Sequence, residues 1–424
     1  MRVLLISANT EKINMPTLPM GLGSVATALV EAGHTVRFLD LMGKADWQVL
    51  LRRTLDEAAP GVIGISIRNI DDQASASPRF LLEPVRAVVG CCRTHTQVPI
   101  VLGGAGYSIF PQAVLDYTGA DMGIQGDGEA AAVMLLKRLE RSTPSMDVPG
   151  LVIRDKGPQA PPEGVRDLDR FAFPGPQWFD PRFARNPDYY LPIQTRRGCP
   201  LNCSYCSTST IEGRLIRKRS PAAVIETLRR WCRAGYSRVY FVDNVFNLPT
   251  RYAQDLCQSI AKAHLDIRWR AILYPGRVTA SLVRSMARAG CQDISLGFES
   301  GSAPILRRMN KRFSLDDIRK VNRWLTDAGI HRMGFLLLGG PGETRQTVLE
   351  SLEFADRLKL DALKVTIGLR IYPYTQLARI AAHEGVIQPD NDLLRPAFYI
   401  ARGLEGWLRE TVSAWAAQRP HWMM

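Results

Sequence analysis

With 424 residues, the chain exceeds what one hydrophobic core usually serves, so we expect two domains and a tail. Its hydrophobic content of 46% and charged content of 22% are ordinary for a globular protein. The sequence contains no run of about 18 apolar residues, the length that a membrane-spanning helix would need. The net charge of +13 is spread over helix faces and arginine doublets, which argues against a nucleic-acid partner. Eight cysteines without a disulfide framework, and a start that lacks a signal-peptide cleavage region, favour the reducing cytoplasm.

Residues 1–140 alternate short apolar runs with amphipathic segments, which predicts a doubly wound parallel sheet of the Rossmann-like α/β type. The predicted strands are 2–7, 35–40, 62–67, 100–103 and 122–125, and the predicted helices are 21–32, 46–59, 78–94, 110–118 and 129–140. Ligands of such sheets bind beyond the carboxyl ends of the strands. Gly103, Gly104 and Gly126 stand at two of those ends, where glycine allows a bulky ligand to approach the backbone closely.

The proline-rich stretch 141–188 is predicted to be an irregular linker, after which a second series of strands and helices begins. Strands are expected near 190–195, 238–243, 268–274, 292–298, 332–338 and 362–371, and helices near 221–234, 250–263, 279–289, 314–328, 344–358 and 376–384. These six units in residues 189–384 predict a partial (β/α)6 TIM barrel whose active face lies at the carboxyl ends of its strands. Residues 385–424 are expected to form a small cap in which Trp407, Trp415 and Trp422 pack.

Cys199, Cys203 and Cys206 form the spacing C-x3-C-x2-C, which is the most informative pattern in the chain. A closed structural zinc site needs four protein ligands, and no further cysteine follows until Cys232. Three thiolates on a 4Fe–4S cluster leave one iron open for a ligand that is not protein. The spacing therefore predicts a 4Fe–4S cluster with an open iron.

With the aromatic Tyr205 ahead of the last cysteine, this loop resembles the cluster loop of the radical S-adenosylmethionine (SAM) superfamily. Residues 207–214, which follow the loop, resemble those members that carry a cobalamin-binding domain ahead of the barrel, and the strand-end loops of residues 1–140 are similar to that domain. The resemblance implies three cofactors, namely a 4Fe–4S cluster, SAM and cobalamin.

The sequence departs from many corrinoid proteins at the residue that would face the cobalt ion. The motif D-x-H-x-x-G, whose histidine binds cobalt in many of them, is missing here. Arg68, at the tip of the third strand, is our candidate for that position, although it could instead pair with Asp71 or Asp72 to shape the loop. A degenerate domain that binds no corrinoid is the remaining alternative.

The resemblance also assigns roles at the strand ends of the barrel. Tyr205 supports adenine, and Gly339 belongs to the glycine turn of the adenine-proximal segment. By their position at strand ends, we expect Asp243 or Asn244 to meet the methionine portion of SAM or the substrate, and Tyr372 to lie beside the adenine edge. Two further sites are the pair Glu299 and Ser300, for the ribose hydroxyls or amino-acid portion of SAM, and Arg370, for a carboxylate of SAM or substrate.

The alternative for Glu299 is a simple ion pair with Arg307 or Arg308 at the start of a helix.

Together these features predict an enzyme that methylates an unactivated carbon of a small molecule, lipid or natural product. Its partners would be that substrate and an external electron donor of the flavodoxin or ferredoxin type. Two alternatives remain open: a non-methylating reaction on the same architecture, such as ring contraction or cyclisation, and an iron–sulfur sensor without catalysis. The identity of the substrate and the oligomeric state are not predicted.

Overall fold

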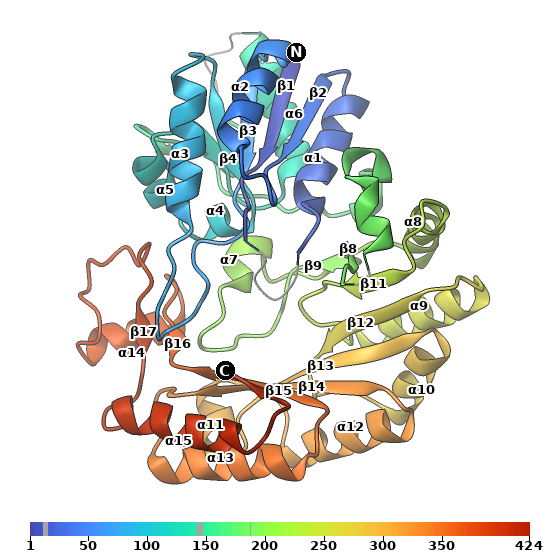
Figure 1. Cartoon of the computed structure of the whole chain (residues 1–424), viewed down its shortest axis with the longest axis vertical. Helices are drawn as coiled ribbons and strands as arrows, with labels where there is room; N and C mark the ends of the chain where they lie inside the picture. Colours follow the sequence, from blue (N-terminus) through green and yellow to red (C-terminus); the bar gives the residue numbers. More distant parts are fainter. Residues whose placement is uncertain (12–15, 142–146, 187) are drawn as a thin grey trace. The chain divides into compact units, whose positions relative to one another are not determined.

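The computed structural model describes residues 1–11, 16–141, 147–186 and 188–424 (Figure 1). The chain forms two compact units. Unit 1 comprises Met1–Asp72, Pro78–Tyr189 and Thr208–Lys218, and unit 2 comprises Gln73–Ser77, Tyr190–Ser207 and Arg219–Met424. The described residues include no helix long and apolar enough to cross a membrane.

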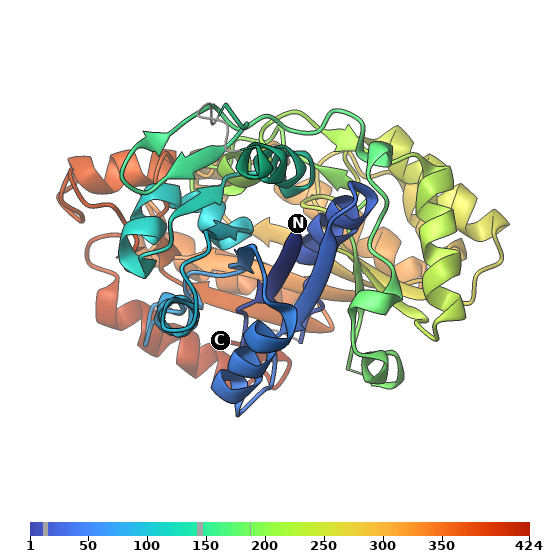
Figure 2. The ribbon, with the colours of Figure 1, turned by 90° about the horizontal axis from the view of Figure 1, so that it is seen from above.

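Unit 1 is built on a seven-stranded sheet in the order β2-β1-β3-β4-β5-β6-β7. Its strands are β1 (Arg2–Ser7), β2 (Thr35–Asp40), β3 (Val62–Ser66), β4 (Ile100–Gly103), β5 (Met122–Ile124), β6 (Leu151–Ile153) and β7 (Gly157–Pro158). Strands β1 to β5 run parallel, as predicted, and Figure 2 shows β1 and β2 side by side near the N-terminus.

Strands β6 and β7 are antiparallel additions at the edge of this sheet. They lie in the stretch 141–188, for which we predicted irregular structure, so that prediction is wrong for residues 151–153 and 157–158. The apolar, β-branched sequence Leu151-Val152-Ile153 pairs with β5, and the chain then turns back through residues 154–156 to Gly157, whose φ is +72°. Residues 142–146 and 187 of the predicted linker lie outside the described residues.

Helices cover the sheet of unit 1 and bury its apolar side chains. They are α1 (Met20–Glu31), α2 (Trp47–Ala58), α3 (Leu82–Arg93), α4 (Ala105–Ile109), α5 (Pro111–Thr118) and α6 (Gly128–Glu140). Helix α1 packs against α6, and their Leu22 and Leu135 share one buried cluster with Val3 and Leu5 of β1. The short helices η1 (Leu168–Arg170), η2 (Pro176–Trp178), η3 (Pro181–Arg185) and α7 (Thr208–Glu212) and the strand β10 (Arg217–Lys218) complete the unit.

Unit 2 contains a second seven-stranded sheet, in the order β18-β15-β14-β13-β12-β11-β8. Its strands are β8 (Leu191–Ile193), β11 (Arg238–Phe241), β12 (Arg268–Leu273), β13 (Cys291–Glu299), β14 (His331–Leu338), β15 (Ala362–Ile367) and β18 (Trp422–Met423). All of the pairs are parallel, so the six strands predicted for a partial barrel are present. Strand β18, from the C-terminal end, adds a seventh beside β15.

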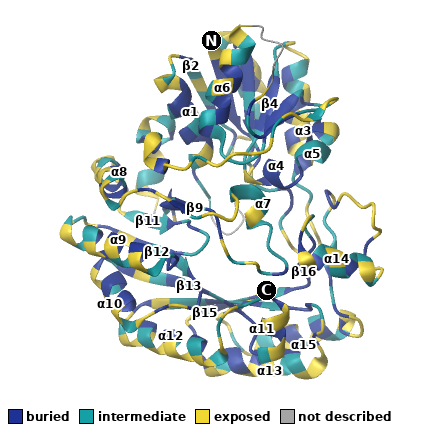
Figure 3. Ribbon diagram, turned by 180° about the vertical axis from the view of Figure 1, so that it is seen from behind, coloured by how far each residue is buried: buried dark blue, intermediate teal, exposed yellow. Residues whose placement is uncertain are grey.

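Helices follow the strands of this sheet in alternation. They are α8 (Pro221–Arg233), α9 (Thr250–Lys262), α10 (Ala280–Arg288), α11 (Ala303–Arg308), α12 (Leu315–Asp327), α13 (Arg345–Arg357), α14 (Gln376–His383) and α15 (Glu405–Ala417). Side chains on alternate positions of the strands, such as Leu296 and Leu336, are buried, whereas their neighbours Ser295 and Phe335 on the opposite face are half-buried. Figure 3 shows the ribbon coloured by these burial classes. One face of the sheet is therefore partly accessible, unlike the filled interior of a complete barrel.

The three C-terminal tryptophans contact arginine side chains. Strands β16 (Leu369–Arg370) and β17 (Phe398–Tyr399) pair antiparallel, and the guanidinium of Arg419 lies 4.4 Å from the ring centre of Trp415 and 5.3 Å from that of Trp422. Arg345 stacks similarly on Trp407, at 5.2 Å. These tryptophans serve packing.

Gly104 tests how tightly the strand-end loops of unit 1 pack. Its φ of +101° is a glycine conformation, and an added Cβ would lie 2.5 Å from the carbonyl oxygen of Ile67. We expect Gly104→Ala to destabilise unit 1 by about 2 kcal/mol or more, seen as a lower thermal unfolding midpoint. Gly21→Ala is the control, because a Cβ there meets nothing within 4 Å; equal midpoints for the two variants would contradict the expectation.

Candidate active site

The three cysteines lie on a loop that follows β8 and β9 (Arg196–Arg197). Cys199 is buried, and Cys203 and Cys206 are half-buried. The loop is held from both sides: the amide of Ser204 donates to the carbonyl of Met309 at 3.2 Å, and the carbonyl of Ser204 accepts from the amide of Leu377 at 2.8 Å. The loop is thus fixed between the end of α11 and the start of α14.

The donor set fits a cluster better than a single ion. In the part of the chain that the structure describes, no three His, Cys, Asp or Glu side chains are close enough to bind one metal ion. A 4Fe–4S cluster does not require this, because each thiolate binds a different iron atom. Burial raises the pKa of the Cys203 thiol, so cluster binding there would be coupled to loss of a proton.

Lys311 joins this loop to Glu299, and the sequence analysis missed it. Its Nζ donates to the hydroxyl of Tyr205 at 2.9 Å and to Oε1 of Glu299 at 3.2 Å, and its side chain is only 4% exposed. Burial by itself lowers the pKa of Lys311, but Glu299, Tyr205 and Cys203 together raise it well above its usual value. The ammonium group therefore remains charged beside a cysteine of the loop.

The alternative expected for Glu299, a pair with Arg307 or Arg308, is wrong, because helix α11 leaves both arginines exposed. Lys311 reaches Glu299 only because the chain turns back after the helix, where Asn310 has a φ of +57°. A lysine twelve residues after an acid carries no periodic signal, so the sequence offered no means of finding this pair.

Glu299 itself has a strained backbone. Its φ is +66°, and the register of β13 with β14 shifts between Gly297 and Glu299. The side chain folds back over Gly297, where an added Cβ would lie 3.1 Å from Oε1. Strain of this kind persists only where the surroundings enforce it, and it often marks a binding site. The neighbouring Ser300 is buried and contacts the hydroxyl of Ser351 at 3.0 Å, so it supports the turn.

Gly339 lies in a turn that a buried carboxylate holds together. The amides of Gly339 and Gly340 both donate to Oε2 of Glu343, the second at 2.7 Å. Oε1 of Glu343 is buried with no hydrogen-bond partner among the described residues, and burial raises the pKa of this group to about 7. Because Glu343 occupies these two amides, they cannot donate to a ligand in this conformation.

Asp243 is fully buried and faces the chain that leads into the cysteine loop. It accepts from the amide and hydroxyl of Thr195, each at 2.7 Å, and from the amide of Arg196 at 2.9 Å. Its other contact is the guanidinium of Arg196, whose Nε lies 3.1 Å away. The contact with SAM or substrate that the sequence predicted stays a prediction, whereas these four interactions give Asp243 a structural role.

Arg370 is likewise engaged by the protein. Its Nη1 donates to the carbonyl of Ile371 at 2.6 Å and its Nη2 to the carbonyl of Leu393 at 2.8 Å, and its guanidinium lies 5.1 Å from the ring centre of Tyr372. The structure therefore brings Arg370 and Tyr372 together, and it ties the end of the sheet to residue 393. The predicted carboxylate contact of Arg370 also stays a prediction.

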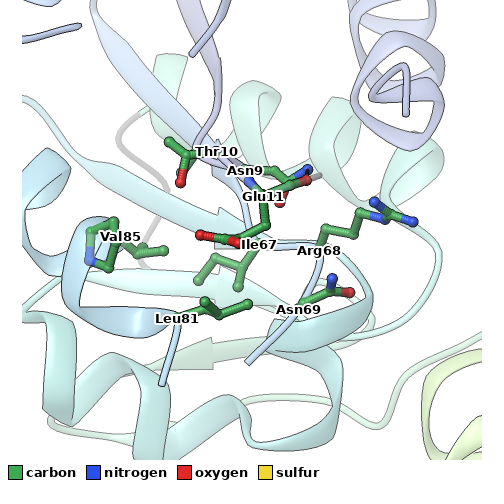
Figure 4. Close-up of a pocket in the computed structure, with 10 residues that line it drawn as sticks. Asn9, Thr10, Glu11, Ile67, Arg68, Asn69, Leu81 and Val85 are labelled. Carbon is green, nitrogen blue, oxygen red and sulfur yellow. Dashed lines mark hydrogen bonds between the residues drawn. The ribbon is translucent and has the colours of Figure 1, made fainter. Parts of the chain in front are cut away.

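Unit 1 offers a pocket at the carboxyl ends of β1 and β3, the two strands between which the sheet order reverses. Figure 4 shows Glu11 between Thr10 and Ile67, while the guanidinium of Arg68 points away from Leu81 and Val85. The remaining lining residues are Ala8, Asn9, Asn69 and Pro84. In doubly wound sheets this reversal point is where ligands bind.

Charged groups surround this pocket. Arg79 binds Oε2 of Glu11 at 2.9 Å and Oδ2 of Asp72 at 3.0 Å, and Arg68 lies exposed at the same edge. The two histidines of residues 1–140 lie elsewhere: His34 directly precedes β2 and His95 precedes β4, at the amino ends of the strands. Neither can therefore meet a ligand at the carboxyl edge.

The glycine loops of unit 1 are tied to one another through Ser108. Its hydroxyl donates to the carbonyl of Gly104 at 2.9 Å and accepts from the amide of Gly126 at 3.0 Å. Gly104 is needed for the close approach to Ile67, while a Cβ at Gly103 would meet only one atom, at 3.8 Å. Part of the glycine pattern thus serves loop packing, and Gly103 leaves open backbone at the edge.

Comparison with known families agrees with this two-unit arrangement of an iron–sulfur loop and a doubly wound sheet. Residues 193–355 match the radical SAM superfamily, and residues 6–136 match the B12 binding domain. The chain therefore contains a radical SAM region and, ahead of it, a B12 binding domain.

Individual relatives extend the match over most of the chain. Tryptophan 2-C-methyltransferase of Streptomyces laurentii is 24% identical over 89% of this chain and 74% of its own length. Hopanoid C-3 methylase of Methylococcus capsulatus is 28% identical over 72% of this chain and 58% of its own. The structure of the methyltransferase TsrM from Kitasatospora setae, with cobalamin and a [4Fe-4S] cluster bound, has a TM-score of 0.87 at 22% identity and covers 100% of this chain and 92% of its own.

The cysteine loop gives a direct prediction on iron content. Replacing Cys199, Cys203 and Cys206 together by Ala should abolish bound iron and the broad visible absorption of the cluster after anaerobic reconstitution. Cys232→Ala is the matched control and should keep the iron of the wild type. Loss of iron in the control as complete as in the triple variant would indicate a four-thiolate site instead.

Glu343 gives a prediction on pH. Its pKa is about 7 in the folded protein against 4.5 as the ordinary value, so the folded state binds the proton more tightly. The free energy of unfolding should therefore fall as pH rises from about 4.5 to about 7, by an amount of order 3 kcal/mol, and then level off. Glu343→Gln cannot titrate and should lack this component when thermal unfolding is followed at several pH values; an unchanged pH profile would refute the assignment.

Proposed function

We propose that this chain is a cobalamin-dependent radical SAM enzyme that transfers a methyl group to an unactivated carbon of a small molecule. The observation that carries the proposal is that one chain contains both a three-cysteine loop and a doubly wound domain with a pocket. Three cysteines would leave one iron of a cluster open, and the pocket lies where the strand order reverses. Its relatives named above are methyltransferases that act on different compounds, so their names do not select a substrate for this chain.

The chain supplies the binding groups for this chemistry. When bound, the cofactors supply a carbon-centred radical that removes a hydrogen atom from the substrate and a methyl group that replaces it. We assign the cluster to the three cysteines, the hydroxyls of a ribose to the carboxylate of Glu299, and the support of adenine to Tyr205 and the turn at Gly339. A carboxylate can accept both ribose hydrogen bonds, and Lys311 orients it for that purpose.

In unit 1 we assign cobalamin to the edge formed by Gly103, Gly104 and Gly126, with Arg68 facing cobalt. The exposed position of Arg68 beside the pocket, and the placement of both histidines at the opposite edge, support this assignment. We place the enzyme in the cytoplasm, because the cluster needs a reducing compartment. We assign it a flavodoxin- or ferredoxin-type electron donor, because the cluster needs a low-potential electron.

The proposal can be tested without knowing the substrate. Anaerobic protein reconstituted with iron, sulfide and hydroxocobalamin should retain cobalamin through gel filtration, and after reduction it should convert SAM into both 5′-deoxyadenosine and S-adenosylhomocysteine. The first product reports radical generation and the second reports methylation of reduced cobalamin. Cys199→Ala should abolish 5′-deoxyadenosine but keep cobalamin. Protein that retains no cobalamin and makes only 5′-deoxyadenosine would instead be a cobalamin-free member of the superfamily.

Glu299→Gln tests the ribose assignment. The amide is a poorer acceptor than the carboxylate, and a hydrogen bond to a charged group contributes about 1.5–3 kcal/mol, so affinity for SAM should fall roughly ten- to a hundredfold. The measurement is the SAM dependence of 5′-deoxyadenosine formation, with iron content as the check on folding. An unchanged dependence in a variant with full iron would assign Glu299 to another task.

A further inference from the structure

The charged pair Glu299 and Lys311 has an arrangement that SAM binding alone does not explain. Its lysine side chain is 4% exposed and its glutamate side chain 12% exposed. Removing both charges from water is costly, and a buried ion pair is seldom a net source of stability. A carboxylate at Glu299 could accept ribose hydrogen bonds without a lysine, so the buried ammonium calls for a separate reason.

The pair lies against the cysteine loop. The ammonium group of Lys311 hydrogen-bonds the hydroxyl of Tyr205, which stands between Cys203 and Cys206 in the sequence, and the same cation acts electrostatically on the Cys203 thiol. Glu299 acts on that thiol with the opposite sign. Two fixed charges of opposite sign therefore act on one ligand of the cluster.

Two aromatic rings also lie near the ammonium group of Lys311. The ring centre of Tyr205 lies 5.2 Å from Nζ, and that of Tyr274 lies 5.9 Å away. The hydroxyl of Tyr274 accepts from the amide of Arg312 at 2.6 Å, which fixes its ring on this side. With aromatic rings in place of water, the charges are weakly screened, so they act strongly on groups nearby.

Reduction adds one electron to the cluster, so a nearby positive charge favours the reduced state and a nearby negative charge favours the oxidised state. The net charge around a cluster and the hydrogen bonds to its sulfurs are established determinants of its reduction potential. We propose that Lys311 and Glu299 together set the reduction potential of the cluster, with Lys311 raising it and Glu299 lowering it. Lys311 is thus a positioning residue that also supplies a fixed charge, and this inference rests on the cluster assigned above.

The test is a redox titration of the reconstituted cluster, followed by electron paramagnetic resonance without SAM or cobalamin. At a fixed applied potential, Lys311→Met should lower the ratio of reduced to oxidised cluster about tenfold, which corresponds to about 59 mV for one electron. Glu299→Gln should raise the ratio, and Lys311→Arg, which keeps the charge, should stay within about threefold of the wild type. Lys262→Met, which removes an exposed charge at the end of α9, is the matched control and should leave the ratio unchanged.

The opposite signs separate an electrostatic role from a structural one. Loosening of the loop would shift the ratio in the same direction for Lys311→Met and Glu299→Gln, and that result would overturn the proposal, as would no shift in either variant. If Lys311→Met takes up no iron, the rise expected in Glu299→Gln decides alone. Iron content is measured on every sample. A wild type without a cluster would refute the proposed function, whereas a wild type with a cluster whose variants lack the expected shifts would refute this inference alone.

Discussion

The cysteine loop depends on one buried carboxylate. Asp243, at the end of β11, binds the backbone and side chain of Thr195 and pairs with Arg196, while Arg196 also donates to the carbonyl of Phe246 at 2.6 Å. Because both charged side chains are at most 2% exposed, loss of either partner would leave an unpaired buried charge. This constraint fixes the chain three residues before Cys199, and the contacts of Ser204 fix it again within the loop.

A similar principle operates in unit 1, where neutral hydrogen bonds replace the ion pair. Ser108 links the loops after β4 and β5, and the backbone of Gly104 packs against Ile67 after β3. Loops at the carboxyl ends of parallel strands lie beyond the regular hydrogen-bonded ladder, so cross-links of this kind hold them in shape. Both units thus carry their candidate binding loops on a frame of parallel strands.

The strands and helices of both sheets were predictable because their apolar residues recur with the periods of strand and helix. The edge hairpin of β6 and β7 was not, since the prolines around it indicated irregular structure and only pairing with β5 stabilises so short a strand. Among the site residues, the cysteines carry a spacing that their chemistry requires. Asp243 and Arg370, in contrast, were singled out by position alone, and the structure shows each of them binding protein groups.

The sequence by itself determined the fold class, the resemblance to radical SAM and B12-binding proteins and the choice of the three cysteines as candidate cluster ligands, because hydrophobic periodicity and cysteine spacing are local properties of the chain. Only the tertiary structure decided which charges meet. Three placements depend on long-range packing. They are the ammonium of Lys311 beside Glu299, the carboxylate of Glu343 across the amides of Gly339 and Gly340, and both histidines of unit 1 away from the carboxyl edge of its sheet. Electrostatic energy depends on distance and burial, and neither can be read from spacing along the sequence.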